Sequence, residues 1–142
     1  MPLTLGIEEE YQIIDPETRQ LASGNQQLLD EGAKILGEQI KPEFMQSQVE
    51  VGTRVCRDIS EARSEIVRLR KTVSDLANDH GLGLAAASTH PISSWSDQTI
   101  TGAERYRQLE DDLRHVVRRL LIFGMHVHIG IEDPELRIDV MN

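Results

Sequence analysis

The stretch "LGIEEEYQII" at residues 5–14 places three consecutive glutamates inside a segment that otherwise has the pattern of a β-strand. Apolar and polar side chains alternate from residue 3 to residue 14, and the alternation ends at the turn sequence "DPET". Strands are depleted in acidic residues, and successive side chains of a strand point to opposite faces of the sheet. We therefore expect Glu8 and Glu10 on one face, about 7 Å apart, and Glu9 on the other.

The rest of the sequence predicts further strands and helices around this first strand. Apolar residues recur at three- and four-residue steps in the expected helices, which span 22–38, 59–80 and 102–123, with another helix starting at Asp133–Pro134. The expected strands after the first span 41–53, 82–88 and 125–131, of which 82–88 is a buried strand of small residues. This order predicts an α+β fold, with an antiparallel or mixed sheet, helices on one face and a functional surface on the other.

The segment "KPEFMQSQVEVGT" at 41–53 carries a second set of polar side chains. Taken as one strand, it directs Phe44, Gln46, Gln48 and Glu50 to the same face. If this strand lies beside the first, the carboxylates of Glu8, Glu10 and Glu50 meet on one surface. Carboxylates at such distances raise each other's pKa by about 1–3 units, and Mg²⁺ or Mn²⁺ would relieve the repulsion. A solvated polar face of the sheet is the alternative.

Three histidines are further candidates. His126 and His128 alternate with apolar residues in "GMHVHIG", so both imidazoles are expected on the polar face, where they can bind a metal, a phosphate or a carboxylate. A pair of surface histidines is the alternative. His90 in "STHP" is either a functional loop residue or part of a turn before Pro91. Arg105 in "ERYRQLEDD" either binds an anionic substrate or lies on a solvated helix face.

Composition narrows the class of partner. The net charge of −9 disfavours nonspecific binding to nucleic acid or to an anionic membrane surface. No apolar run approaches the ~20 residues that span a bilayer, and no secretory signal is visible, so a cytoplasmic location is expected. The single Cys56 excludes an internal disulfide, and the sequence contains neither a Walker loop nor a Gly-x-Ser-x-Gly elbow.

Five segments, taken together and in order, resemble the carboxylate–amine ligases of the glutamate–cysteine ligase type. They are "LGIEEEYQIIDPET", "QSQVEVGTRVCRD", "STHP", "ERYRQL" and "GMHVHIGIED". This bacterial group, glutamate–cysteine ligase family 2, has a fold similar to the glutamine synthetase catalytic core. The resemblance implies that residues 1–142 form the N-terminal half of one catalytic domain without an internal boundary. Family members are more than twice as long, so we expect the chain to need a complementary C-terminal half.

The resemblance also implies an ATP-dependent reaction. ATP would phosphorylate a substrate carboxylate, and an amine such as that of cysteine would displace the phosphate to form an amide. Carried over from the family pattern, the metal-binding and catalytic residues are Glu8, Glu10 and Glu50, with Mg²⁺ or Mn²⁺ as the ion. His126, His128 and Thr53 are expected near the nucleotide, and Arg105, Tyr106 and His90 near the substrate. The resemblance does not identify the acid and amine substrates or the number of metal ions. Family members commonly form dimers, so it also implies a possible homodimer.

Two other functions fit the same residues. One is a noncatalytic module that binds metal, nucleotide or another protein on the same scaffold. The other is a small metal-dependent hydrolase built on His126, His128 and His90, for which stoichiometric zinc would be the sign.

Overall fold

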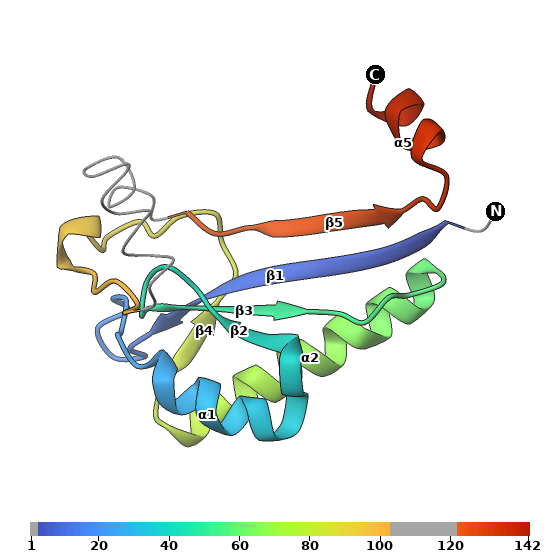
Figure 1. Ribbon diagram of the computed structural model, residues 1–142. Coiled ribbons are helices and arrows are strands. Elements are labelled where there is room, and N and C mark those ends of the chain that lie inside the picture. The colour runs from blue at the N-terminus through green and yellow to red at the C-terminus, as the bar shows by residue number, and fades with distance from the viewer. Residues whose placement is uncertain (1–2, 103–121) are drawn as a thin grey trace.

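The structure, a computed structural model, describes residues 3–102 and 122–142 (Figure 1). Within these residues an antiparallel sheet has five strands: β1 (Thr4–Ile14), β2 (Ile40–Pro42), β3 (Gln48–Gly52), β4 (Gly83–Ala85) and β5 (Met125–Gly130). The α-helices are α1 (Asn25–Leu36), α2 (Ile59–Asp79) and α5 (Pro134–Met141), and the 3₁₀ helices are η1 (Gly37–Gln39) and η2 (Trp95–Asp97). The α+β fold predicted from the sequence is confirmed.

β1, the strand with three glutamates, is the axis of the sheet. One of its edges pairs with β3, which in turn pairs with β2. Its other edge is divided, because β4 pairs with residues 12–14 and β5 with residues 4–9 (Figure 1). Segments distant in the sequence therefore meet along β1, with β3 on one side and β5 on the other.

Helices α1 and α2 lie on the same side of the sheet (Figure 1). The odd-numbered residues of β1 and β3 face them, and the core contains Tyr11, Ile13, Val49 and Val51 packed with Leu28, Leu36, Ile66, Leu69 and Val73. Because strand side chains alternate, the even-numbered Glu8 and Glu10 project from the opposite face. The helices thus supply the hydrophobic core and leave this polar face available.

α2 begins and ends where its sequence predicts. Asp58 is its N-cap, and its carboxylate accepts a hydrogen bond of 2.9 Å from the backbone N–H of Glu61. The carboxylate of Glu61 reaches back to the backbone N–H of Arg57 at 2.8 Å. Gly81 follows the helix with a φ of +69°, a backbone conformation that favours glycine. The cap and the glycine set the two ends of the helix, and its apolar stripe packs against the sheet.

The prediction of one strand over 41–53 is wrong, because two strands and a turn occupy this range. β2 ends at Pro42, and a turn leads into β3, whose first residue Gln48 donates its backbone N–H to the carbonyl of Met45 at 3.0 Å. Phe44 and Met45 leave the sheet and pack in a second cluster with Leu21, Trp95 and Ile100. Residues 44–47 are two apolar residues followed by two polar ones, and they form the turn and this separate cluster rather than a continuous strand.

The strand expected at 82–88 is shorter and less buried than predicted. Only Gly83–Ala85 pair with β1, these residues are half-buried, and residues 86–88 are exposed. The reason is the divided edge of β1, where β5 rather than β4 pairs from residue 9 toward the N-terminus. The helix expected at 102–123 falls almost entirely outside the described residues, and Ile122 at its end forms a β-bridge with Thr89.

Among the residues that the structure describes, no helix combines the length and the hydrophobicity that a membrane crossing requires.

Candidate functional site

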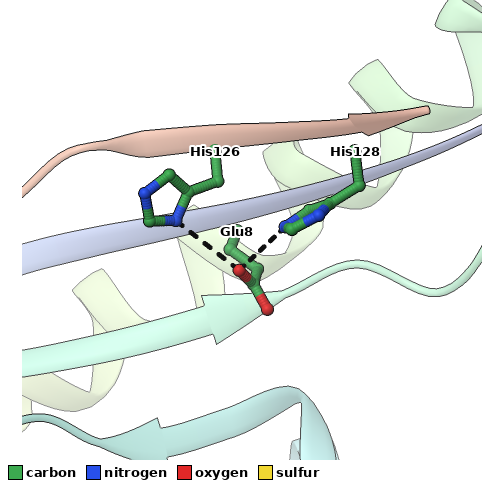
Figure 2. Close-up of side chains that lie close together, drawn as sticks. All are labelled: Glu8, His126 and His128. Carbon is green, nitrogen blue, oxygen red and sulfur yellow. Dashed lines mark hydrogen bonds and ion pairs between the residues drawn. The ribbon is translucent and has the colours of Figure 1, made fainter. Parts of the chain in front are cut away.

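Glu8 lies against two histidines of the neighbouring strand (Figure 2). The β1–β5 register pairs Glu8 with His126 and Gly6 with His128. Oε2 of Glu8 lies 2.9 Å from Nε2 of His128 and 3.6 Å from Nδ1 of His126. The hydrogen bond with His128 is the main cause that lowers the pKa of Glu8, whereas partial burial opposes it. A charged carboxylate and two exposed imidazoles thus converge on one point of the polar face.

A second group joins three carboxylates from three segments. The β1–β3 register places Glu10 directly opposite Glu50, and Glu43 reaches the same place from the turn between β2 and β3. One oxygen of each carboxylate lies within 4.8 Å of the others. Burial raises the pKa of Glu50, although the ammonium of Lys41 opposes this effect. Carboxylates at this distance repel one another unless a cation or a proton intervenes.

The two groups of side chains offer different donor atoms to a divalent cation. Three carboxylate oxygens are the hard donors that Mg²⁺ and Mn²⁺ prefer. The Glu8, His126 and His128 group also offers one donor atom from each residue within 4.8 Å, with imidazole nitrogens among them. Imidazole and carboxylate together suit transition metals such as Mn²⁺ or Zn²⁺. The donor chemistry of this face therefore fits a bound divalent cation.

A pocket adjoins Glu8 on this face. Its volume is about 400 Å³, and it is lined by Gly6, Ile7, Glu8, Glu38, Gln39, Lys41, Gly52, Thr53 and His128. The hydroxyl of Thr53 accepts a hydrogen bond of 3.0 Å from the backbone N–H of Ile7. The N–H of Thr53 in turn bonds the carbonyl of Ile7 at 2.9 Å. Thr53 thus ties the end of β3 to β1 while it forms part of the pocket wall.

The remaining candidates of the sequence do not join this cluster in the described contacts. The ring of His90 accepts backbone hydrogen bonds from Ile92 and Ser93 at 3.3 and 3.0 Å, so it organises its own turn. This is the alternative that the sequence offered for a histidine before a proline. Arg105 and Tyr106 lie outside the described residues.

Glu43 and Lys41 belong to this face, and the sequence reasoning missed both. The single-strand interpretation of 41–53 put Glu43 on the opposite face from Glu50, because their numbers differ in parity. The turn between β2 and β3 breaks this alternation and brings Glu43 to the carboxylates. Pro42 was the available signal, since proline removes a backbone donor and marks the end of a strand.

Comparison with known proteins assigns the family. The chain matches the profile described as glutamate-cysteine ligase family 2 over residues 4–142. The chain belongs to this family. It is 57% identical to a protein of Roseiflexus castenholzii and 60% identical to one of Herpetosiphon aurantiacus, both named "Putative glutamate--cysteine ligase 2". Each match covers 99% of this chain but 37% of the relative, so the chain spans little more than a third of these family members.

Solved structures share the fold at low sequence identity. A glutamate–cysteine ligase from Francisella tularensis in complex with AMP superimposes with a TM-score of 0.73 and 18% identity, covering 99% of this chain and 29% of that protein. A bifunctional glutathione synthetase from Pasteurella multocida gives a TM-score of 0.62 at 14% identity, covering 99% of this chain and 18% of that protein. These two structures show the fold, and the match to the family profile confirms the family resemblance predicted from the sequence motifs.

Proposed function

We propose that this glutamate–cysteine ligase family 2 chain carries the metal- and phosphate-binding face of an ATP-dependent carboxylate–amine ligase. One observation supports the proposal above the others. Carboxylates from β1, β3 and the turn between β2 and β3 meet on the polar face of the sheet, in a chain that belongs to this family. The AMP held by the Francisella tularensis ligase is a further support for nucleotide binding.

The residues fall into three roles in this proposal. Glu10, Glu43 and Glu50 would hold a hard cation, Mg²⁺ or Mn²⁺, and Glu8 with His126 would hold a second position beside it. His128 and Thr53 would border the nucleotide phosphates in the adjoining pocket. A bound divalent cation would neutralise phosphate charge during transfer. Arg105, Tyr106 and His90 stay proposed as substrate-proximal residues.

The proposed reaction has two balanced steps. An oxygen of the substrate carboxylate attacks the γ-phosphorus of ATP, the bond from that phosphorus to the bridging oxygen breaks, and ADP leaves. The amine nitrogen then attacks the carbonyl carbon of the acyl phosphate, phosphate leaves, and the nitrogen loses a proton. The products are an amide, ADP and phosphate. Glutamate and cysteine are the substrates that the family name suggests.

We propose that residues 1–142 form the N-terminal part of one catalytic domain. The relatives' additional length would provide the remaining nucleotide and amino-acid contacts. Dependence on ATP and on free amino acids favours the cytoplasm as the location, and a homodimer remains compatible with the proposal.

Metal binding tests the proposal directly. Mn²⁺ is titrated into the chain, and free Mn²⁺ is followed by electron paramagnetic resonance for wild type, Glu10→Gln and Glu50→Gln. Loss of one charged oxygen ligand is expected to weaken Mn²⁺ binding about tenfold or more in either variant. Glu17→Gln, in the exposed turn after β1, removes the same charge away from the site and is the matched control. Equal Mn²⁺ affinity in all four proteins would contradict the proposal.

A metal-dependent hydrolase is the second candidate, favoured by the group of Glu8, His126 and His128. Two histidines and one carboxylate also form the ligand set of some catalytic zinc sites. Since the contacts of His90 lie in its own turn, Glu8 would be the third ligand in place of His90. Elemental analysis of the purified chain separates the two functions. One zinc per chain, retained through dialysis against excess Mg²⁺, would favour the hydrolase.

A further inference from the structure

Lys41 lies where the two groups of candidate ligands meet. It is on β2, opposite Glu50 in the β2–β3 register. Its Nζ lies 3.4 Å from Oε1 of Glu50 and 3.8 Å from Oε1 of Glu8. Glu8 uses its other oxygen, Oε2, for the histidines. One ammonium group is thus shared by one carboxylate of each group.

The pocket beside Lys41 has a floor of glycine backbone. Gly6 on β1 and Gly52 on β3 point to the same face as Glu8, which the register places opposite Gly52. A Cβ atom at Gly6 would come no closer than 3.7 Å to His128, and one at Gly52 no closer than 3.8 Å to Glu8. A methyl group at either glycine would therefore make an ordinary contact with its neighbour without a clash, and both glycines line the pocket. A ligand can approach the sheet closely between Lys41 and His128.

Lys41 and a divalent cation compete for the same carboxylates. Two unit charges 4 Å apart interact by about 1 kcal/mol in water and about 4 kcal/mol at the effective dielectric of a protein surface. A cation bound through Glu8 or Glu50 would therefore repel the ammonium group from its present position. The side chain of Lys41 is half exposed, and its four-carbon stem allows the ammonium to turn toward the pocket.

We propose that Lys41 exchanges partners as the site fills. In the metal-free chain it neutralises Glu8 and Glu50, and after a divalent cation takes over these carboxylates it binds phosphate oxygens in the pocket floored by Gly6 and Gly52. This inference rests on the proposed function and adds an anion-binding residue to it. An ammonium group suits this role, since it donates charge-assisted hydrogen bonds to phosphate without a fixed geometry.

Opposite changes in two binding affinities test the exchange. The Lys41→Met variant keeps the length of the side chain and removes its charge. It is expected to bind Mn²⁺ alone about fivefold more tightly, because a competing charge is gone. It is expected to bind preformed magnesium tripolyphosphate about tenfold more weakly, because the phosphate loses its ammonium donor. Both affinities are measured by titration calorimetry, with circular dichroism to establish that each variant folds.

Two further variants complete the experiment. Lys71→Met removes the same charge from the exposed face of α2, where Lys71 pairs with Asp75, and should change neither affinity. Lys41→Arg keeps a cation and should retain most of the tripolyphosphate binding. A purely structural role of Lys41 would not tighten one ligand while weakening the other.

The outcomes separate this inference from the proposed function. If wild type binds Mn²⁺ and Glu50→Gln weakens it, but Lys41→Met has unchanged or weaker Mn²⁺ binding, the inference alone is wrong. Tighter Mn²⁺ binding with unaltered tripolyphosphate affinity would also overturn it, since the exchange requires both. If wild type binds no Mn²⁺, the proposed function fails, and the inference fails with it.

Discussion

Glu9 is the member of the glutamate triplet that faces the helices. It is 4% exposed, and Arg70 of α2 bonds both of its carboxylate oxygens, one of them through Nε at 2.8 Å. The hydroxyl of Tyr11 donates to the same carboxylate. Burial works against the charged form of Glu9, but the hydrogen bonds from Arg70 and Tyr11 outweigh it and lower its pKa. This ion pair joins β1 to α2 on the helix-covered face of the sheet, while Glu8 and Glu10 project from the other face.

The Arg70→Met variant tests the contribution of the Arg70–Glu9 ion pair to stability. It leaves the charge of Glu9 buried without its partner, so we expect a loss of about 2 kcal/mol in the free energy of unfolding at pH 7. Urea denaturation followed by circular dichroism measures this loss. Arg63→Met, on the exposed side of the same helix, is the control, and its effect should stay within about 0.5 kcal/mol.

The same pair of proteins has a distinctive pH dependence. In wild type the pKa of Glu9 is below its ordinary value of 4.5, so its contribution is complete above that pH and is lost as the pH falls through the folded-state pKa. Without Arg70, burial would raise the pKa of Glu9, and protonation would then relieve the unpaired charge. The stability gap between wild type and Arg70→Met should therefore begin to narrow above pH 4.5, where Glu9 of the variant takes up a proton, and should narrow further as the pH falls through the lower pKa of Glu9 in wild type. A constant gap down to pH 3 would show that Glu9 is not the cause.

At the scale of single elements, α2 depends on its cap. The Asp58→Ala variant removes the carboxylate that accepts the N–H of Glu61, and we expect a loss of about 1 kcal/mol in the free energy of unfolding. Asp79→Ala is the control at the other end of the helix. There a negative charge faces the carbonyl end of the helix dipole, so its removal should be neutral or slightly stabilising. Equal losses in both variants would show that the cap contributes nothing specific.

The elements that the sequence predicts well are those in which one pattern has one cause. In β1 the alternation reflects a sheet with a core face and a polar face, and its bounds match the structure closely. In α2 the stripe, the cap and the glycine agree with one another. Glu8, Glu10 and Glu50 project from the same face because side chains alternate in regular strands and the antiparallel register pairs Glu10 with Glu50.

Sequence-based prediction fails where a segment interpreted as one strand changes the element against which it packs. The pattern of residues 41–53 predicts one strand, yet Phe44 and Met45 are consecutive apolar residues that pack against Trp95 and Ile100 in a separate cluster. The apolar residues at 82–88 similarly look like one strand, although only three of them pair with β1. Which segments share an edge depends on contacts far apart in the sequence, and no local pattern encodes them.

At the scale of the whole molecule, β5 presents an apolar surface among the residues that the structure describes. Met125, Val127 and Ile129 of β5 are each at least 50% exposed, on the face opposite the two histidines. Within the described residues β5 pairs with β1 alone, which leaves its second edge free of strand partners. α5 projects beyond the sheet and has no buried residue (Figure 1). An exposed apolar strand with a free edge is a site of association between chains.

We expect the 142-residue chain to associate with itself through this surface of β5. The double variant Val127→Thr and Ile129→Thr keeps β-branched residues in the strand and removes much of the apolar surface. Sedimentation velocity over a range of protein concentrations should show self-association weakened about tenfold. Val67→Thr, an equally exposed position on α2, is the matched control and should leave association unaltered.

Metal binding gives this experiment its internal reference. Threonine at 127 and 129 lies on the opposite face from His126 and His128, so Mn²⁺ affinity should equal that of wild type. Weaker association with intact Mn²⁺ binding would locate the contact on the apolar face of β5. Association that persists in the double variant, or that falls equally in Val67→Thr, would contradict it, because neither result depends on this strand. A loss of both properties would mean that the substitutions disturb the pairing of β5 with β1 on which the polar face is built.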